Sequence, residues 1–371
     1  MNALRPGPAD RLMAVPKEAG PMEKAFVTTI IGSMPKPPWL LAQKALNDPQ
    51  ADHHGKGAEW LPPPAALRQA QDDACRVAIH DQERAGIDII SDGEQRRKSY
   101  LTHITMQLDG IDYEKTVAKL ARNGRRTIQA GRIVGPIRRR GSILREDLRF
   151  LMAEASGPVK VTLPGPMTVW DTLADEFYGD ERALALDFAA AINEEAREID
   201  ALGPAVIQFD EPVFSRYPER MAEWGIEALD RCLEGLAAAT AVHVCYSYPM
   251  PGVPRPIQDS YPVILKELER SKADQLALEF EASRLDPALL RLCPSKTILF
   301  GCIDNGIEEP ETPGHVASKL LAAAEYHPPE KIQAAPDCGL VPLSQKAARA
   351  KLAAMAEGAR IARERIGAPA E

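Results

Sequence analysis

Short apolar runs alternate with longer amphipathic stretches along most of this chain. This alternation is typical of βα units, in which each buried strand is followed by a helix that covers a parallel sheet. The apolar runs predict eight strands, at Phe26–Ser33, Ile87–Glu94, Val159–Pro164, Ala205–Glu211, Ala241–Ser247, Gln275–Phe280, Thr297–Asp304 and Ile332–Asp337.

The stretches between these runs carry helical periodicity. They predict helices at Ala65–Ala85, Glu181–Leu202, Trp224–Ala239, Ile257–Ser271, Asp286–Leu292, Thr312–Glu325 and Ser344–Ile366. Eight strand–helix repeats fit a closed barrel better than an open sheet. The sequence therefore predicts an α/β fold, a single (β/α)8 TIM barrel over residues 25–371.

Two segments interrupt the repeat. Trp39–Pro64 is an excursion after the first strand that contains prolines and histidines. Ser99–Leu151 is too long for a simple loop and carries its own β-like stretch at Thr127–Arg138, so we expect a hairpin inserted after strand 2, over the barrel mouth. Residues 1–24 are rich in Pro, Ala and Gly and lack the apolar core of a signal peptide, which predicts a flexible N-terminal arm.

The composition is that of an ordinary globular protein. The chain has 371 residues, 45% hydrophobic and 26% charged, and no run of about 20 apolar residues that would cross a membrane. The net charge of -8 argues against nucleic acid as a partner. The basic run Arg138–Arg140 is most simply a solvated loop. We expect a cytoplasmic protein whose six cysteines are thiols, in the core or at a metal.

Polar side chains gather where the predicted strands end. Active sites of barrels are built from the carboxyl ends of the strands and the loops that follow them. These ends carry Ile31–Ser33, Asp92–Arg97, Pro164–Pro166, Asp210–Pro212, His243 with Cys245, Glu279 with Glu281, Asp304, and Pro336–Gly339. Carboxylates at a largely closed mouth need a cation or hydrogen-bond donors to remain ionised, which predicts a functional site at this edge.

His243 and Cys245 are two residues apart, so their side chains share one face of a strand. Such a pair is often buried core. With Cys338 it offers an imidazole and two thiolates, and Glu281 would complete a tetrahedron, a set that suits zinc better than magnesium or calcium. Glu279 is the rival ligand, and Glu281 is preferred because it lies nearer the end of its strand. Ordinary burial accounts for Cys293 and Cys302.

Six short motifs occur in an order that resembles one known family. They are Thr29–Ser33, Asp92–Arg96, Ile207–Pro212, the His243 and Cys245 pair, Glu281–Arg284 and Pro336–Leu340. This set resembles the catalytic barrel of cobalamin-independent methionine synthase and its short, single-barrel relatives. The resemblance extends from about Phe26 to the final helix, and the ordered combination is specific although each motif is short.

The resemblance implies a set of site residues. A catalytic zinc ion would be bound by His243, Cys245, Glu281 and Cys338. The substrate homocysteine would be bound by Ile31, Gly32, Ser33, Glu94 and Asp210. Trp170 is similar to a tryptophan that the family places beside the folate, although a large aromatic side chain at a barrel mouth is as often simple packing.

Two departures from the family bear on the methyl donor. The full-length enzymes have two related barrels, and one is found here. They also place a histidine two residues after the aspartate of the seventh strand, and the matching position is Gly306, which leaves Asp304 as the catalytic candidate there. Some short relatives use a corrinoid or another protein-bound methyl donor. A related group transfers the thiol of coenzyme M onto an epoxide, and Arg138–Arg140 is the candidate binding site for the sulfonate of coenzyme M.

The physical chemistry agrees with this resemblance. A free thiol is mostly protonated at neutral pH, and a metal ion deprotonates it, so a zinc-bound thiolate is a nucleophile for attack on an alkyl carbon. We therefore expect a zinc-dependent methyltransferase that converts homocysteine into methionine with a donor such as 5-methyltetrahydrofolate. The alternatives are an epoxide–coenzyme M type transferase, a metal-free barrel similar to porphyrinogen decarboxylase, and a binding protein with a structural zinc.

Overall fold

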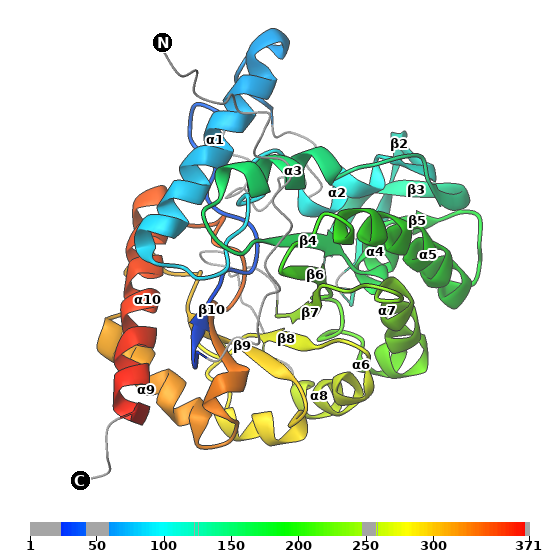
Figure 1. Ribbon diagram of the computed structural model, residues 1–371. Helices are drawn as coiled ribbons and strands as arrows, with labels where there is room; N and C mark the ends of the chain where they lie inside the picture. The colour runs from blue at the N-terminus through cyan, green and yellow to red at the C-terminus, as the bar shows by residue number, and fades with distance from the viewer. Residues whose placement is uncertain are drawn as a thin grey trace, which may run out of the picture.

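A curled sheet of seven parallel strands forms the centre of the molecule (Figure 1). The computed structural model describes residues 24–41, 59–121, 123–124, 126–246, 257 and 259–367. The strands occur in the order β1 (Val27–Thr28), β10 (Ile332–Pro336), β9 (Thr297–Ile303), β8 (Gln275–Leu278), β7 (Ala239–Val244), β6 (Val206–Asp210) and β4 (Lys160–Pro164). Neighbours in this order pair in parallel, as the alternating pattern predicted.

Helices surround this sheet on the outside (Figure 1). They are α1 (Pro64–Ala85), α4 (Pro166–Thr172), α5 (Glu181–Asp200), α6 (Pro218–Arg220), α7 (Ile226–Cys232), α8 (Tyr261–Arg270), α9 (Pro313–Ala324) and α10 (Gln345–Gly367). A π-helical turn, η3 (Met221–Gly225), precedes α7, and 3-10 turns form η4 (Pro287–Leu292) and η5 (Pro329–Lys331).

The segment predicted as the second strand, Ile87–Glu94, is not a regular strand. It makes two isolated parallel bridges, from Ile89 to Thr29 and from Ile90 to Val159, so it lies between β1 and β4. The pairing stops at Ser91, whose N–H is taken by the side chain of Gln82 at 3.0 Å. Gly93 and Glu94 then follow with positive φ, a turn that ends extended backbone. The seven-stranded sheet and these bridges replace the eight strands that were predicted.

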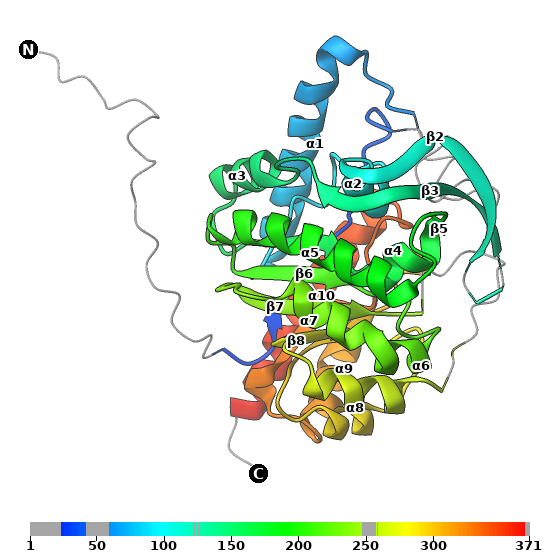
Figure 2. The same ribbon diagram turned by 90° about the vertical axis from the view of Figure 1, so that its right-hand side faces the viewer.

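The predicted insertion is present as a hairpin. Strands β2 (Leu108–Ala121) and β3 (Arg126–Arg139) pair antiparallel, and β3 also pairs with the short strand β5 (Ala174–Asp175). Helices α2 (Tyr100–Thr105) and α3 (Arg145–Glu154) flank the hairpin in sequence. Figure 2 shows the two long strands curving beside α4 and α5, and both helices contact the hairpin.

Two predicted helices differ in detail. The helix expected over Trp224–Ala239 ends at Cys232, because the chain turns through Gly235 at φ +74° and enters β7 at Ala239. The segment Asp286–Leu292 is a 3-10 turn whose Asp286 side chain accepts the N–H of Ala288. The predicted arm over residues 1–24, except Lys24, and residues 42–58 of the excursion lie outside the described residues.

Small and branched side chains fill the space that the curled sheet encloses. Val27, Ile89, Val206 and Ala241 form one buried cluster. A second cluster consists of Ile31, Ala277, Leu299 and Ala335. Because alternate residues of a strand point to the same face, these residues set the register that brings the carboxyl ends of the strands together. None of the described helices is long and apolar enough to span a bilayer.

The hairpin is fixed to the body of the protein by a buried ion pair. Glu195 of α5 is fully buried and accepts from the Arg139 guanidinium at 2.7 Å and from the N–H of Leu144 at 2.7 Å. Replacement of Glu195 with Ala removes the carboxylate that accepts the N–H of Leu144 and leaves Arg139 paired with Glu198 alone. We expect Glu195→Ala to lower the free energy of unfolding by about 3 kcal/mol in urea titrations. Glu194→Ala, at the exposed neighbouring position, serves as the control and should change it by under about 0.5 kcal/mol; an equal loss in both variants would contradict the role of the pair.

Candidate metal centre and the adjoining acidic site

Three buried side chains with metal-binding atoms converge at the carboxyl edge of the sheet. His243 lies near the end of β7, Cys245 directly follows that strand, and Cys338 lies two residues beyond β10. Their ligand atoms all lie within 4.8 Å of one another, and the two Sγ atoms are 3.6 Å apart. An imidazole with two thiols at this spacing is a donor set that zinc accepts.

The electrostatics of this cluster also favour a cation. Neither ring nitrogen of His243 has a hydrogen-bond partner among the described residues, although the ring is buried. Burial lowers the pKa of His243, but Cys245 and Asp210 together raise it by more, so the pKa lies above its ordinary value. The hydrogen bond with Cys245, together with burial, raises the pKa of Cys338. A metal ion would satisfy all three groups and displace the thiol protons, so metal binding should release protons.

The Glu281 carboxylate lies apart from this three-residue cluster. It is paired with two side chains of α9: Oε1 is 2.8 Å from His315 Nε2, and Oε2 is 3.2 Å from Lys319 Nζ. Its backbone is held by Asp337, whose carboxylate accepts the N–H groups of Phe280, Glu281 and Ala282. The loop that carries Glu281 is therefore anchored to the residue that precedes Cys338.

Glu279, the rival ligand, is fully buried. Its Oε2 accepts the N–H of Tyr246 at 3.1 Å, so it supports the backbone that follows Cys245. Its charge also contributes to the raised pKa of Cys338. Glu279 therefore lies close to the metal-binding cluster, on the side where β7 ends.

The segment Ile31–Ser33 lies beside Glu94. A Cβ atom added to Gly32 would be 2.8 Å from Glu94 Oε1, so only glycine permits this approach. The same oxygen accepts from the Thr162 hydroxyl at 2.7 Å, and the Arg97 guanidinium lies 3.7 Å away. Glu94 has φ +55°, a backbone conformation that is uncommon outside glycine. The positive φ and the bond from Thr162 together hold its carboxylate over Gly32.

Asp210 connects this acidic region to the metal-binding cluster. It is the last residue of β6 and is in register with His243 of β7. Its Oδ1 accepts from the Gln208 amide at 2.8 Å, and burial raises the pKa of its carboxyl to about 7. Lys160 of β4 is also buried beside it, and burial lowers the pKa of the Lys160 ammonium to about 7. The sequence interpretation missed Lys160 and Gln208, which lie inside strands predicted as ordinary core.

Comparison with known proteins shows the family to which this chain belongs. Residues 26–361 match the family described as cobalamin-independent synthase, catalytic domain. The chain belongs to this family. It is 30% identical to a methionine synthase of Sulfurisphaera tokodaii over 91% of this chain and 93% of that protein. A methionine synthase of Saccharolobus solfataricus is 29% identical over 91% of this chain and 95% of that protein.

A solved structure is also similar throughout its length. It is described as a B12-independent methionine synthase from Shewanella sp. W3-18-1 in complex with selenomethionine. The two chains superpose with a TM-score of 0.85 and 35% sequence identity, over 93% of this chain and 100% of the other. The resemblance inferred from the six motifs is thus confirmed at the level of the family.

Trp170, which the family resemblance places beside a folate, is packed among aromatic and basic side chains here. Its ring meets Tyr217 and Trp224 edge to face, at centroid distances of 5.1 and 5.5 Å. The Arg220 guanidinium lies 5.4 Å from the ring centroid. This surrounding explains the position of Trp170 by packing, and its contact with a donor stays a prediction.

Asp304 is held in a local turn at the end of β9. Its Oδ1 accepts the N–H of Gly306 at 2.7 Å, and its own N–H donates to Glu311 at 2.8 Å. The next residue, Asn305, is buried and donates its side-chain amide to the carbonyl of Gly339. These bonds connect the ends of β9 and β10 and give Asp304 a structural role, whereas its part in catalysis is untested.

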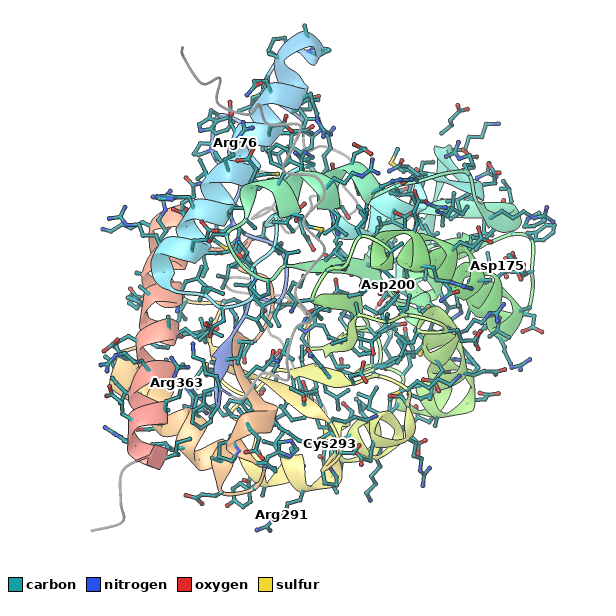
Figure 3. All side chains as sticks on the ribbon, viewed as in Figure 1. Arg76, Asp175, Asp200, Arg291, Cys293 and Arg363 are labelled. Carbon is teal, nitrogen blue, oxygen red and sulfur yellow. The ribbon has the colours of Figure 1, made fainter. Side chains whose placement is uncertain are left out.

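The remaining residues singled out from the sequence lie in structural contacts. Cys293, labelled in Figure 3, follows η4, and its Sγ faces the carbonyl of Leu290 at 3.6 Å. Cys302 is likewise buried, with its Sγ 3.5 Å from the carbonyl of Ala335. Within the basic run, Arg139 is paired with Glu195 and Glu198, so its guanidinium is already engaged. The geometry thus gives no support to a sulfonate site built on Arg139.

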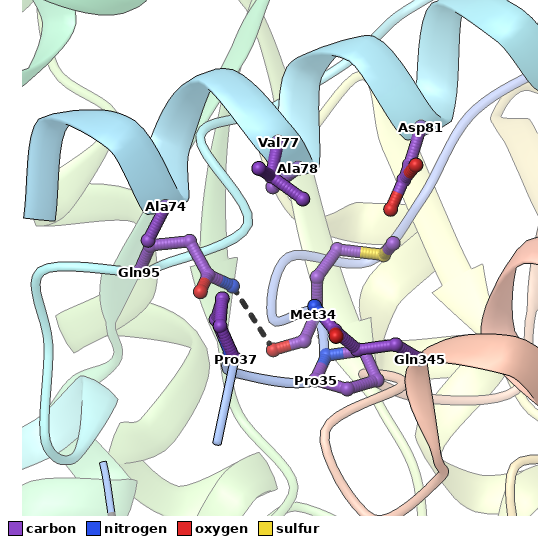
Figure 4. A pocket seen from close by; sticks show the side chains of 9 residues that line it. All are labelled: Met34, Pro35, Pro37, Ala74, Val77, Ala78, Asp81, Gln95 and Gln345. Atoms are coloured by element: carbon purple, nitrogen blue, oxygen red, sulfur yellow. Dashed lines mark hydrogen bonds between the residues drawn. The ribbon is translucent and has the colours of Figure 1, made fainter. Parts of the chain in front are cut away.

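A small pocket opens between the segment after β1, helix α1 and the start of α10 (Figure 4). Its lining consists of Met34, Pro35, Pro37, Ala74, Val77, Ala78, Asp81, Gln95 and Gln345. The side-chain amide of Gln95 donates to the carbonyl of Met34 at 3.2 Å. None of the predicted metal or substrate residues lines this pocket, so it is separate from the site.

Metal binding can be tested with matched cysteine variants. We expect metal-free protein to bind about one equivalent of Zn²⁺ and Cys338→Ser to lose at least about 100-fold in affinity, because even residues outside a ligand set change metal affinity by 10- to 100-fold. Cys302→Ser, at another buried thiol, should retain the affinity. Competition titrations with a chromogenic chelator measure both. Wild-type affinity in Cys338→Ser would contradict the assignment of the cluster.

Proposed function

We propose that this protein is a zinc-dependent methyltransferase that methylates the thiol of homocysteine to give methionine. The observation that carries the proposal is the convergence of His243, Cys245 and Cys338 within 4.8 Å at the strand edge where Asp210 also lies. Membership of the cobalamin-independent synthase family and the methionine synthases to which the chain is similar support the reaction. The methyl donor that we propose is a reduced folate such as 5-methyltetrahydrofolate.

The metal would be held by His243, Cys245 and Cys338, with Glu281 as the fourth protein ligand. When bound, zinc lowers the pKa of a substrate thiol so that the thiolate predominates at neutral pH. Glu281 would have to exchange its ion pairs with His315 and Lys319 for the metal. Because Asp337 fixes the Glu281 backbone, this exchange would have to come from rotation of the Glu281 side chain.

The amino-acid part of the substrate would lie between a backbone segment that binds its carboxylate and two acidic side chains that bind its ammonium group. The backbone at Ile31, Gly32 and Ser33 would receive the carboxylate, and Asp210 with Glu94 would hold the ammonium group. The sulfur then attacks the methyl carbon of the donor: an S–C bond forms, the C–N bond to the donor nitrogen breaks, and that nitrogen takes the electron pair and a proton. We further propose Trp170 as a donor contact and Asp304 as a catalytic residue near the departing nitrogen.

We propose that residues 25–371 form one (β/α)8 domain in which Ile87–Ser91 takes the place of the eighth strand. The bridges to Thr29 and Val159 support this closure, as do the ladder-type bonds from Ile89 to Thr28 and from Lys160 to Ile90. We also propose that residues 1–24 form a flexible arm and that the protein acts in the cytoplasm.

The reaction is tested by calorimetry followed by an activity assay. Zinc-loaded protein titrated with homocysteine in buffers of different ionisation enthalpy should release about one proton per site, because the thiol is deprotonated on binding. The complex should then form methionine from 5-methyltetrahydrofolate. Homocysteine binding with proton release but without turnover would point to a different donor, and the absence of both binding and proton release would overturn the proposed substrate.

The raised pKa of Asp210 predicts how amino-acid binding depends on pH. Only the ionised carboxylate attracts an ammonium group, and burial raises this pKa to about 7. The affinity of metal-free protein for L-methionine should therefore increase as pH rises from 6 to 8, roughly tenfold if ionisation of this group is required. Asp210→Asn should bind more weakly and lose most of the increase. An unchanged pH profile in Asp210→Asn would show that Asp210 does not hold the ammonium group.

A further inference from the structure

The carbonyl groups of four successive residues, Ile30 to Ser33, are each held by a different part of the protein. Lys160 Nζ donates to the carbonyl of Ile30 and Gln208 Nε2 to that of Ile31, both at 2.7 Å. The Ser91 hydroxyl donates to Gly32 at 3.1 Å, and the N–H of Leu340 to Ser33 at 2.7 Å. Regular pairing of β1 stops at Thr29, so these donors replace the ladder that a neighbouring strand would supply.

These four bonds fix which side of the backbone faces the site. With the carbonyls turned toward β4, β6, Ser91 and Leu340, the N–H groups of Ile31 and Gly32 are left with no acceptor among the described residues. Successive unpaired N–H groups attract an anion. The segment that the proposed function assigns to the substrate carboxylate is thus held in that orientation by three side chains and one backbone N–H from elsewhere in the protein.

Gln208 makes a second bond that sets it apart from the other donors. The same amide nitrogen that donates to Ile31 also donates to Asp210 Oδ1 at 2.8 Å. A primary amide has two N–H donors, and both partners here are acceptors, which fixes the nitrogen toward them. Gln208 is fully buried, so its side chain has little freedom to move. One side chain therefore connects the backbone assigned to the carboxylate with the acid assigned to the ammonium group.

We propose that Gln208 is a positioning residue that couples the two halves of an α-amino-acid binding site. By holding the Ile31 carbonyl and the Asp210 carboxylate at one fixed separation, it makes the protein favour ligands with adjacent ammonium and carboxylate groups over thiols or thioethers that lack either. Ser91 is a weaker positioning residue for the carboxylate half, since its hydroxyl donates to the carbonyl of Gly32 and accepts the N–H of Gly93 but has no bond to Asp210. The proposal rests on the proposed function, because it assumes an amino-acid substrate.

Three ligands of the zinc-loaded protein test this inference by calorimetry. They are L-methionine, 4-(methylsulfanyl)butanoate, which lacks the ammonium group, and 3-(methylsulfanyl)propylamine, which lacks the carboxylate. Wild-type protein should prefer methionine to both. In Gln208→Met, which keeps the shape but not the donors, each preference should fall about tenfold, the value expected for a hydrogen bond to a charged group. A general loss of packing would weaken all three ligands by one common factor and leave the preferences intact.

Two further variants complete the design. Gln333→Met replaces another buried glutamine inside the sheet, in β10, and should leave all preferences unchanged. Ser91→Ala should reduce the preference that depends on the carboxylate more than the one that depends on the ammonium group. Gln208→Leu, which removes the same donors, carries the test if Gln208→Met does not fold. Unchanged preferences in folded Gln208→Met, or in Gln208→Leu where that variant carries the test, would overturn the inference. A wild-type protein that does not bind methionine would instead overturn the proposed function.

Discussion

The contact between Cys245 and Cys338 is the constraint on which the rest of the site depends. These thiols are 93 residues apart in sequence and 3.6 Å apart in space, and both are buried beside an imidazole that has no partner among the described residues. Burial of polar groups without partners costs free energy, about 1–3 kcal/mol for an unsatisfied donor or acceptor. Binding of a metal ion removes this cost, so the arrangement is understandable as a binding site and costly as plain core.

The surroundings of this contact hold it in place from both strands. Asp337 precedes Cys338 and accepts three backbone N–H groups from the loop that carries Glu281. A Cβ atom on Gly301 would lie 2.1 Å from Asp337 Oδ1, so the missing side chain in β9 leaves room for this carboxylate. Asp337 thus connects one ligand-bearing loop to the other. Gln208 in β6 and Lys160 in β4 hold the carbonyls of the substrate segment, so both halves of the site are positioned by residues in the strands or directly after them.

The sequence predicted the residues that end strands better than it predicted the strands. Parallel strands end at a common edge, so His243, Cys245, Cys338 and Asp210 could be placed together from strand position alone. The prediction of a regular strand at Ile87–Glu94 was wrong, because a hydrogen bond to the Gln82 side chain and a left-handed turn end its pairing. The hydrophobic periodicity of a sequence carries no information about such hydrogen bonds. For the same reason the sequence pattern assigned no role to Gln208 or Lys160, since their partners lie 177 and 130 residues away.

Zinc K-edge X-ray absorption, recorded with and without homocysteine, tests the central claim most directly. The cluster provides two sulfur ligands from the protein. The account predicts about two sulfur neighbours per zinc ion in the free protein and about three when homocysteine is bound. A count that remains at two under saturating homocysteine would contradict activation of the thiol by the metal, and a zinc ion without sulfur neighbours would contradict the site itself.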